Sequence, residues 1–284
     1  MKQLSLTQLV EAVEDLKPLP AIATRVIQLT EDIDSDISDI ADAISSDQAI
    51  TARLLRLSNS PFYGFARRTT TVREAVVRLG LAAIRSQVLI IASGDLLRRK
   101  LGGYSLEGLG LWRHSLAAAV CSRKLAARAR SPLGEEFFTA GLLHDVGKVI
   151  LHQHVRSAYE EILEAVSTSK AAWNEAESAV LGFDHALVGE QVALKWNLPQ
   201  VLVEAIRHHH DPEQADSDGR LHACAVHIAD AVCLMMGVGV GGDGLRYRLS
   251  TGALAALGLE GSDIQSLVAD MVPALRDLES YLDI

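Results

Sequence analysis

The stretch that decides the fold is Gly-Leu-Leu-His-Asp-Val-Gly-Lys, residues 141–148. Imidazole and carboxylate side chains bind first-row transition metals well, and a carboxylate such as Asp145 can bridge two ions through its two oxygens. Lys148 lies four residues after His144 and three after Asp145, so the helix predicted here carries all three on one face. Gly147 has no side chain and leaves room for another helix to approach. The stretch therefore predicts a metal site on a helix.

A complete metal site needs ligands from other parts of the chain. The candidates stand in predicted helices or at their ends: His114, His185, His209, His210 and Asp230. Asp230 is informative because it interrupts an apolar helix, where a carboxylate is costly unless it is paired or binds a metal. Simpler readings compete: His144 and Asp145 as a hydrogen-bonded pair, His114 as a core histidine, and His185 as a helix cap beside Asp184.

Helical spacing of apolar residues runs through the whole chain. A capping box at Thr71–Glu74 begins one helix, and Gly80 can end it. No alternating run is long enough for a strand, so the predicted fold class is all-α, with two lobes. The glycines between 100 and 110 suggest a boundary there, which gives an amino-terminal lobe of residues 1–103 and a metal-binding lobe of residues 104–284. The helices expected in the second lobe cover residues 111–130, 135–151, 155–168, 171–182, 185–196, 199–210 and 221–236.

Composition limits the class of protein. Hydrophobic residues make up 49% of the 284 residues, charged residues make up 22%, and the net charge is −9. Such a chain should fold, and its acidic balance argues against nucleic acid as a partner. None of its three cysteines forms a Cys-x-x-Cys pair, and no apolar run reaches the roughly 20 residues of a membrane span. Since no signal peptide is evident either, we expect a cytoplasmic protein with no membrane partner.

The order of the candidate ligands resembles the HD superfamily of metal-dependent phosphohydrolases, in which a histidine precedes a His-Asp pair and a distal aspartate. The resemblance implies one ion held by His114, His144, Asp145 and Asp230. Asp145 would bridge to a second ion, held by His185, His209 and His210. It further implies two divalent transition metals (Fe, Mn, Zn or Ni) and a catalytic role for Lys148.

The first part of the chain resembles a narrower family, the HD-related output (HDOD) domains of bacterial signalling proteins. The resemblance rests on residues 16–29, 40–47, 54–60 and 75–80 and extends over roughly residues 14–235. Many HDOD domains have lost metal ligands, and the family is usually described as non-catalytic, whereas this chain keeps all seven. The chain lacks the Gly-Tyr-Pro segment that follows the histidine pair in HD-GYP phosphodiesterases, and it has Gly110 where a glutamate would serve a third metal.

Two functions are therefore expected, in this order. The first is a bacterial signal-transduction output module that carries a dinuclear metal site and acts through a signalling protein partner. The alternative is a metal-dependent phosphohydrolase or phosphodiesterase that takes a nucleotide or another phosphoester as its ligand. The family resemblance favours the first function and the complete ligand set favours the second, so the sequence leaves open whether the protein is an enzyme.

Overall fold

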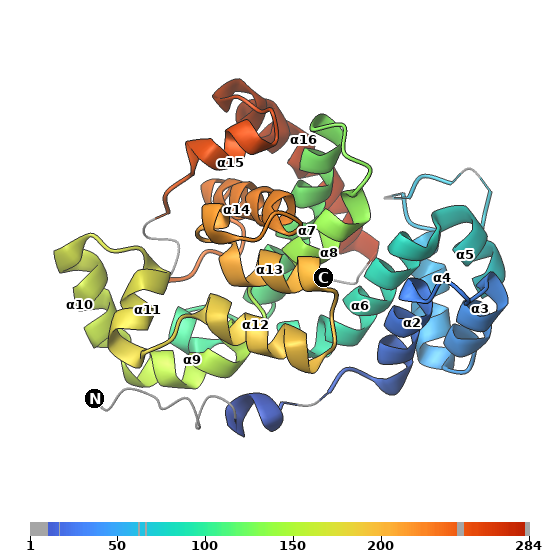
Figure 1. Ribbon diagram of the computed structural model, residues 1–284, viewed down its shortest axis with the longest axis horizontal. Helices are drawn as coiled ribbons and strands as arrows, with labels where there is room; N and C mark the ends of the chain where they lie inside the picture. The colour runs from blue at the N-terminus through green and yellow to red at the C-terminus, as the bar shows by residue number, and fades with distance from the viewer. Residues whose placement is uncertain (1–10, 17, 62, 66, 243–246, 282–284) are drawn as a thin grey trace. The chain divides into compact units, whose positions relative to one another are not determined.

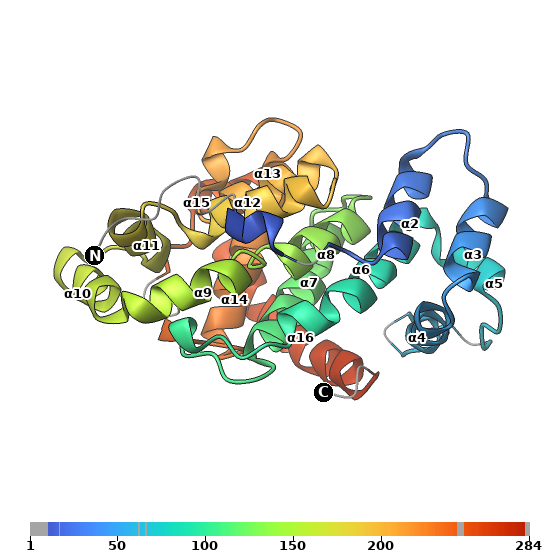
Figure 2. The ribbon, with the colours of Figure 1, turned by 90° about the horizontal axis from the view of Figure 1, so that it is seen from below.

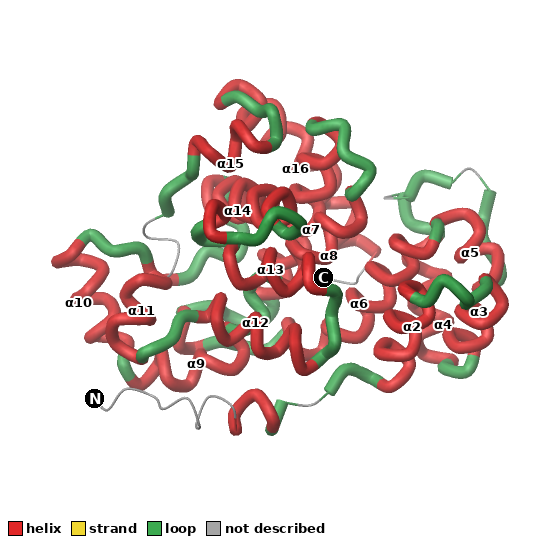
Figure 3. Tube along the Cα trace, viewed as in Figure 1, coloured by secondary structure: helices red, strands yellow, loops and turns green. Residues whose placement is uncertain are grey.

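The computed structural model describes residues 11–16, 18–61, 63–65, 67–242 and 247–281. Within these residues all regular secondary structure is helical, as predicted (Figure 3). The only bridge of the strand type in the described part is an isolated antiparallel pair, Leu101 with Leu106. None of the described helices is long and apolar enough to cross a membrane.

The chain divides into two compact units. The larger unit comprises residues 95–269 together with the described residues before 18, and the smaller comprises residues 18–94 with the described residues after 269. This division differs from the expected one at 103/104. The glycines after residue 100 are not a linker: Gly103 and Tyr104 are buried, and a Cβ at Gly103 would collide with the carbonyl oxygen of His152.

The smaller unit is a set of helices, and those that begin after Asp36, Asp47 and Thr71 are capped by these side chains. Thr71 Oγ1 accepts from the backbone N–H of Glu74 at 3.1 Å, which confirms the predicted helix start, although the Glu74 carboxylate reaches back to the N–H of Thr70. Gly80 ends that helix at φ 80°, a conformation that glycine adopts without strain. The helices are α2 (Ala21–Glu31), α3 (Ile37–Ser45), α4 (Gln48–Ser58), α5 (Val72–Leu79) and α6 (Leu81–Leu97), which continues into the larger unit.

The larger unit is built around α7, which packs against both α8 and α14, while α12 packs against α13 and α9 (Figures 1 and 2). The core is apolar and includes the fully buried Trp112, Phe137 and Phe138. The first elements are η1 (Gly102–Tyr104), α7 (Gly110–Arg128), α8 (Gly134–Leu143), α9 (Lys148–Ser157), α10 (Tyr159–Ser169) and α11 (Trp173–Leu181). They are followed by α12 (His185–Lys195), α13 (Gln200–His208), η2 (Pro212–Gln214), α14 (Arg220–Met235), α15 (Thr251–Ala256) and α16 (Gly261–Tyr281), which extends into the smaller unit.

The predicted single helix over 135–151 is wrong. Helix α8 ends at Leu143, residues 144–147 form a tight turn, and α9 begins at Lys148. The turn is closed by bonds between residues three apart, from the N–H of Val146 to Leu143 O at 3.0 Å and from that of Lys148 to Asp145 O at 3.0 Å. The expected role of Gly147 is confirmed, because a Cβ there would collide with the carbonyl oxygen of His185. Glycine thus allows the start of α9 to lie directly against α12.

Candidate metal centre

The seven predicted ligands come from separate elements and meet inside the larger unit. His114 lies on α7, His144 and Asp145 in the turn after α8, His185 at the start of α12, His209 and His210 just after α13, and Asp230 on α14. All are buried except His210, which is half-buried. Nitrogen and oxygen atoms within 4.8 Å of one another define three ligand groups: His114–His144–Asp230, His144–Asp145–His209 and His185–His209–His210. We call the first group the inner half of the centre and the last group the outer half.

Asp145 lies between the two halves, and each of its carboxylate oxygens faces one of them. Oδ2 is 3.6 Å from His114 Nε2 and 3.4 Å from His144 Nε2. Oδ1 is 3.4 Å from His185 Nε2 and 3.9 Å from His209 Nε2. This is the geometry of a carboxylate that can give one oxygen to each of two ions.

The imidazole rings present Nε2 to the centre because Nδ1 is engaged elsewhere. Nδ1 lies 3.1 Å from Val238 O in His114, 2.8 Å from Gly141 O in His144 and 2.7 Å from Ile206 O in His209. Carbonyl oxygens only accept, so each Nδ1 carries the hydrogen, and in the neutral ring Nε2 is the nitrogen that keeps a lone pair for a metal. Among the described residues, Nε2 of His144 and Nε2 of His209 have no hydrogen-bond partner although both are buried. Buried acceptors of this kind need a partner, and a metal ion satisfies them.

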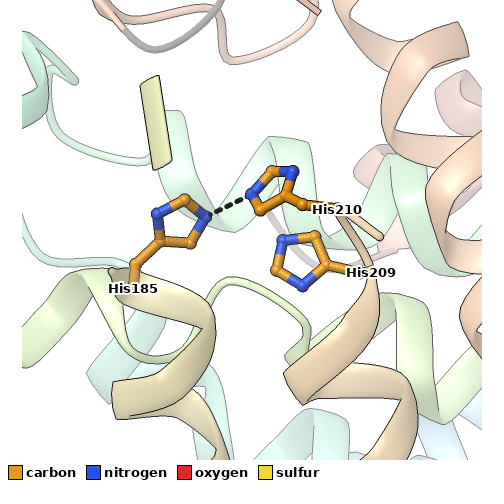
Figure 4. Close-up of side chains that lie close together, drawn as sticks. All are labelled: His185, His209 and His210. Carbon is orange, nitrogen blue, oxygen red and sulfur yellow. Dashed lines mark hydrogen bonds between the residues drawn. The ribbon is translucent and has the colours of Figure 1, made fainter. Parts of the chain in front are cut away.

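Three rings of the outer half face one another, as Figure 4 shows. His185 Nε2 and His210 Nε2 are 2.8 Å apart, and the ring centroids of His209 and His210 are 4.0 Å apart. His208, the remaining member of the histidine triple, lies 3.7 Å from Glu204 Oε2 instead. The structure therefore brings His209 and His210, and not His208, into the ligand groups.

Lys148, the predicted catalytic residue, also reaches the centre. Its Nζ donates to Asp145 Oδ2 at 2.6 Å and lies 5.5 Å from the centroid of the Tyr104 ring. The ammonium group therefore lies next to the carboxylate that stands between the two halves.

Burial and charge shift the pKa values of these groups in different directions. Burial opposes protonation of His114, but the neighbouring Asp230 and Asp145 carboxylates outweigh it and raise the pKa to about 9. Burial likewise disfavours the charged form of Asp145, yet His144 and Lys148 hold its pKa well below the usual range. In His209 and His210, burial and the neighbouring rings lower the pKa well below its ordinary value. The carboxylate is thus ionised and two outer rings are neutral, the states in which they bind metal.

A cavity of about 380 Å³ opens beside the outer half. Its walls include Lys148, His185, His210 and Asp230 from the centre. Other lining residues bring aromatic or charged groups: Trp173, Tyr247, Glu175, Asp184, Asp211, Arg207 and Arg248. His114, His144 and His209 are not part of its wall. A small ligand in this cavity would therefore meet the outer half of the centre.

One carboxylate that contacts the centre was not predicted from the sequence. Glu177 on α11 is fully buried, and its Oε2 lies 2.7 Å from His185 Nδ1. A signal existed, since Trp173, Glu177 and Leu181 recur every four residues, so that the glutamate interrupts an apolar stripe. Tyr247 was not predicted either: its ring centroid lies 6.1 Å from that of His210 and its hydroxyl donates to His227 O at 2.8 Å, and no sequence pattern indicates this position.

Comparison with known proteins identifies the family. A sequence model of the HDOD domain matches residues 16–212, which is more than half of the chain. The chain belongs to the HDOD family. The match covers the smaller unit up to Gly94 and the predicted ligands from His114 to His210, and Asp230 lies beyond it.

Solved structures similar to this HDOD protein extend over nearly its whole length. An HDOD domain protein of unknown function from Geobacter sulfurreducens is 26% identical with a TM-score of 0.69, and the match covers 98% of this chain and 96% of that one. A candidate phosphohydrolase from Shewanella amazonensis SB2B is 25% identical with a TM-score of 0.73, covering 96% and 97%. An uncharacterized protein of Treponema pallidum (strain Nichols) is 29% identical over 213 residues, which are 73% of this chain and 40% of that protein's length.

Proposed function

We propose that this HDOD protein binds two divalent transition-metal ions and uses them to hydrolyse a phosphoester. The observation that carries the proposal is the position of Asp145, whose two oxygens face two separate sets of histidines. His114, His144 and Asp230 would complete the inner ion's ligands, and His185, His209 and His210 the outer ion's. Fe, Mn, Zn and Ni all suit a set of imidazoles and carboxylates.

Two such ions, when bound, supply Lewis acidity for a phosphoryl oxygen and make a water molecule acidic enough to attack phosphorus. The chain's own residues have three tasks around that chemistry. The cavity would admit the phosphoester beside the outer half, and the buried rings of His114 and His144 would hold the inner ion, while Asp230 of that half also lines the cavity. Lys148 is close enough to stabilise negative charge that develops on the phosphoryl group.

The test begins with tag-free protein, because a histidine tag would itself bind metal. Elemental analysis after loading with Mn²⁺, Fe²⁺, Zn²⁺ or Ni²⁺ should give about two ions per chain. A panel of p-nitrophenyl phosphate, bis(p-nitrophenyl) phosphate and nucleotides should then reveal a substrate. Lys148→Ala should lower turnover about 10²- to 10³-fold, the range found when one charge-stabilising donor is removed, with metal content unchanged.

Lys100→Ala is the matched control, because Lys100 lies on the surface of the same unit and pairs only with the exposed Glu107 among the described residues. It should leave turnover unchanged. Fewer than two ions in the loaded protein would contradict the proposed metal binding. Two bound ions without hydrolysis of any ester in the panel would contradict the proposed catalysis.

Family membership supports a second role, as a signalling output module that acts through a protein partner. The smaller unit exposes large apolar side chains, with Ile33 96% and Val77 63% exposed and Ile37 and Leu81 also on the surface. Ile37, Val77 and Leu81 line the same pocket, and contiguous exposed apolar groups are typical of interaction sites. If partner binding is the function, Val77→Asp should abolish binding of an identified partner, whereas Lys148→Ala should leave it unchanged.

A further inference from the structure

The carboxylate of Glu177 connects three groups in the interior of the larger unit. Its Oε2 accepts from the backbone N–H of His185 at 2.9 Å and lies 2.7 Å from His185 Nδ1, while Oε1 accepts from Trp173 Nε1 at 3.0 Å. Glu177 is fully buried, so water does not compete for these bonds. A carboxylate accepts and does not donate, so His185 Nδ1 must carry a hydrogen, and in the neutral ring, the form that binds metal, His185 Nε2 is the acceptor toward the centre.

His185 differs in this respect from the three other rings whose Nδ1 contacts are described above. Their Nδ1 partners are backbone carbonyl oxygens, those of Val238, Gly141 and Ile206. Backbone acceptors stay in place whatever the side chains are. Among these four rings, His185 is the one whose Nδ1 is held by a side chain, and that ring belongs to the outer half.

We propose that Glu177 is the positioning residue of the outer half: it fixes the tautomer and ring plane of His185 and thereby sets the affinity for the outer ion. The inference rests on the proposed function in one respect, that the centre binds two ions. Carboxylates that hold a ligand histidine contribute about 10- to 100-fold to metal affinity. None of the described hydrogen bonds joins Glu177 to His114, His144 or Asp230. The affinity for the inner ion should therefore not depend on Glu177.

A purely structural role for Glu177 is the competing explanation, since its bond to the His185 N–H also satisfies a free donor at the start of α12. The two roles differ in what they change. If the role is structural, substitution of Glu177 should lower the thermal stability of the protein and weaken the binding of both ions together. If the role is positioning, the substitution should weaken the binding of the outer ion alone and change the tautomer of the His185 ring.

The experiment is a calorimetric titration of the metal-free, tag-free chain with Mn²⁺ alone. Wild-type protein should bind two ions, and Glu177→Gln should bind the outer ion about 10- to 100-fold more weakly, with the inner ion within about threefold of wild type. Nitrogen NMR of the metal-free ring should report His185 as the Nδ1–H tautomer in wild type and as a mixture in the variant. The matched control is Trp173→Phe, which keeps the carboxylate and its two bonds to His185 and should leave both affinities near wild type.

A second variant covers the case in which Glu177→Gln alone does not fold. A glutamine that turns its oxygen toward His185 turns its amide toward the Trp173 N–H, so that two donors meet. The double variant Glu177→Gln/Trp173→Phe removes that conflict and should fold, while the weaker neutral acceptor still lowers the affinity for the outer ion. A wild-type chain that binds fewer than two ions would contradict the proposed function itself. If wild type binds two and the variants bind both unchanged, or lose both equally, only the role of Glu177 is overturned.

Discussion

The inner and outer halves of the centre use the same kinds of ligand in different surroundings. The inner half has two buried rings held by backbone carbonyls and a carboxylate, Asp230, 3.0 Å from His114 Nε2. The outer half has three rings and no carboxylate of its own, and two of these rings line the cavity. Enclosure favours tight retention of an ion, whereas an open side is what a substrate needs. The comparison suggests an inner ion that anchors the helices and an outer ion that exchanges and meets the substrate.

The largest effect is expected from a substitution that removes the carboxylate between the two halves. Asp145→Ala should abolish binding of both ions, because each half would lose the carboxylate oxygen that faces it. Elemental analysis should fall from about two ions per chain to none. Asp211→Ala is the control, because Asp211 lines the same cavity without belonging to any ligand group. Retention of one tightly bound ion by Asp145→Ala would show that the halves do not share this ligand.

The next prediction separates the halves from each other. His185→Ala should weaken the binding of the outer ion on the order of 100-fold or more. Loss of the ligand itself should have a larger effect than loss of Glu177, which only orients it. His114→Ala should do the same to the inner ion. Metal titration of each variant should therefore leave one strong site. Equal weakening of both ions by either substitution would contradict a division into halves.

A smaller effect concerns pH in the inner half. Because the pKa of His114 is raised to about 9, metal must displace a proton from this ring at neutral pH. The affinity of His185→Ala protein for its remaining ion should rise about tenfold per pH unit from 7 to 9 and then level off. The stability of the metal-free protein should instead fall as the pH rises over this range. The stabilisation that protonated His114 contributes is fully present below the ordinary pKa of about 6.5 and is lost as the pH rises through about 9.

Titrations at several pH values, paired with thermal unfolding of the metal-free chain, measure both trends. His114→Ala is the control, because it removes the ring that titrates. A flat affinity between pH 7 and pH 9 in His185→Ala protein would mean that the Asp230 contact does not protonate His114 in solution.

Much of this arrangement could be read from the sequence, because the ligands are residues that apolar helices rarely tolerate. Asp230 in a run of alanine, valine and isoleucine had to be paired or bound, and it lies 3.0 Å from His114. The turn at residues 144–147 could not be read, since its residues have helical spacing and only the contact of Gly147 with α12 distinguishes it. The apolar stripe around Glu177 marks it as a buried carboxylate, but its contact with His185 depends on the packing of α11 against α12, which the stripe does not encode.

The last prediction concerns cyclic di-GMP, a phosphoester that the protein should not hydrolyse. We predict no measurable hydrolysis of cyclic di-GMP by the metal-loaded chain, although the outer half faces a cavity. No Gly-Tyr-Pro segment follows His210, and the carboxylates of Asp184 and Asp211 line the cavity that the ligand would enter. Arg207 offsets this charge only in part, because it already lies 3.5 Å from Glu190 and 3.9 Å from Asp184. Repulsion between these acids and a ligand with two negative phosphates opposes binding.

The measurement is chromatography of the nucleotide products against a protein-free blank that contains the same metal, with bis(p-nitrophenyl) phosphate as the positive control. Cleavage of the control ester without cleavage of cyclic di-GMP is the expected pattern, since the control ester carries one negative phosphate and is repelled less by the two acids. Metal-dependent cleavage of cyclic di-GMP above the blank would contradict it. That result would mean that the openness of the outer half, and not the charge around it, decides which phosphoesters reach the centre.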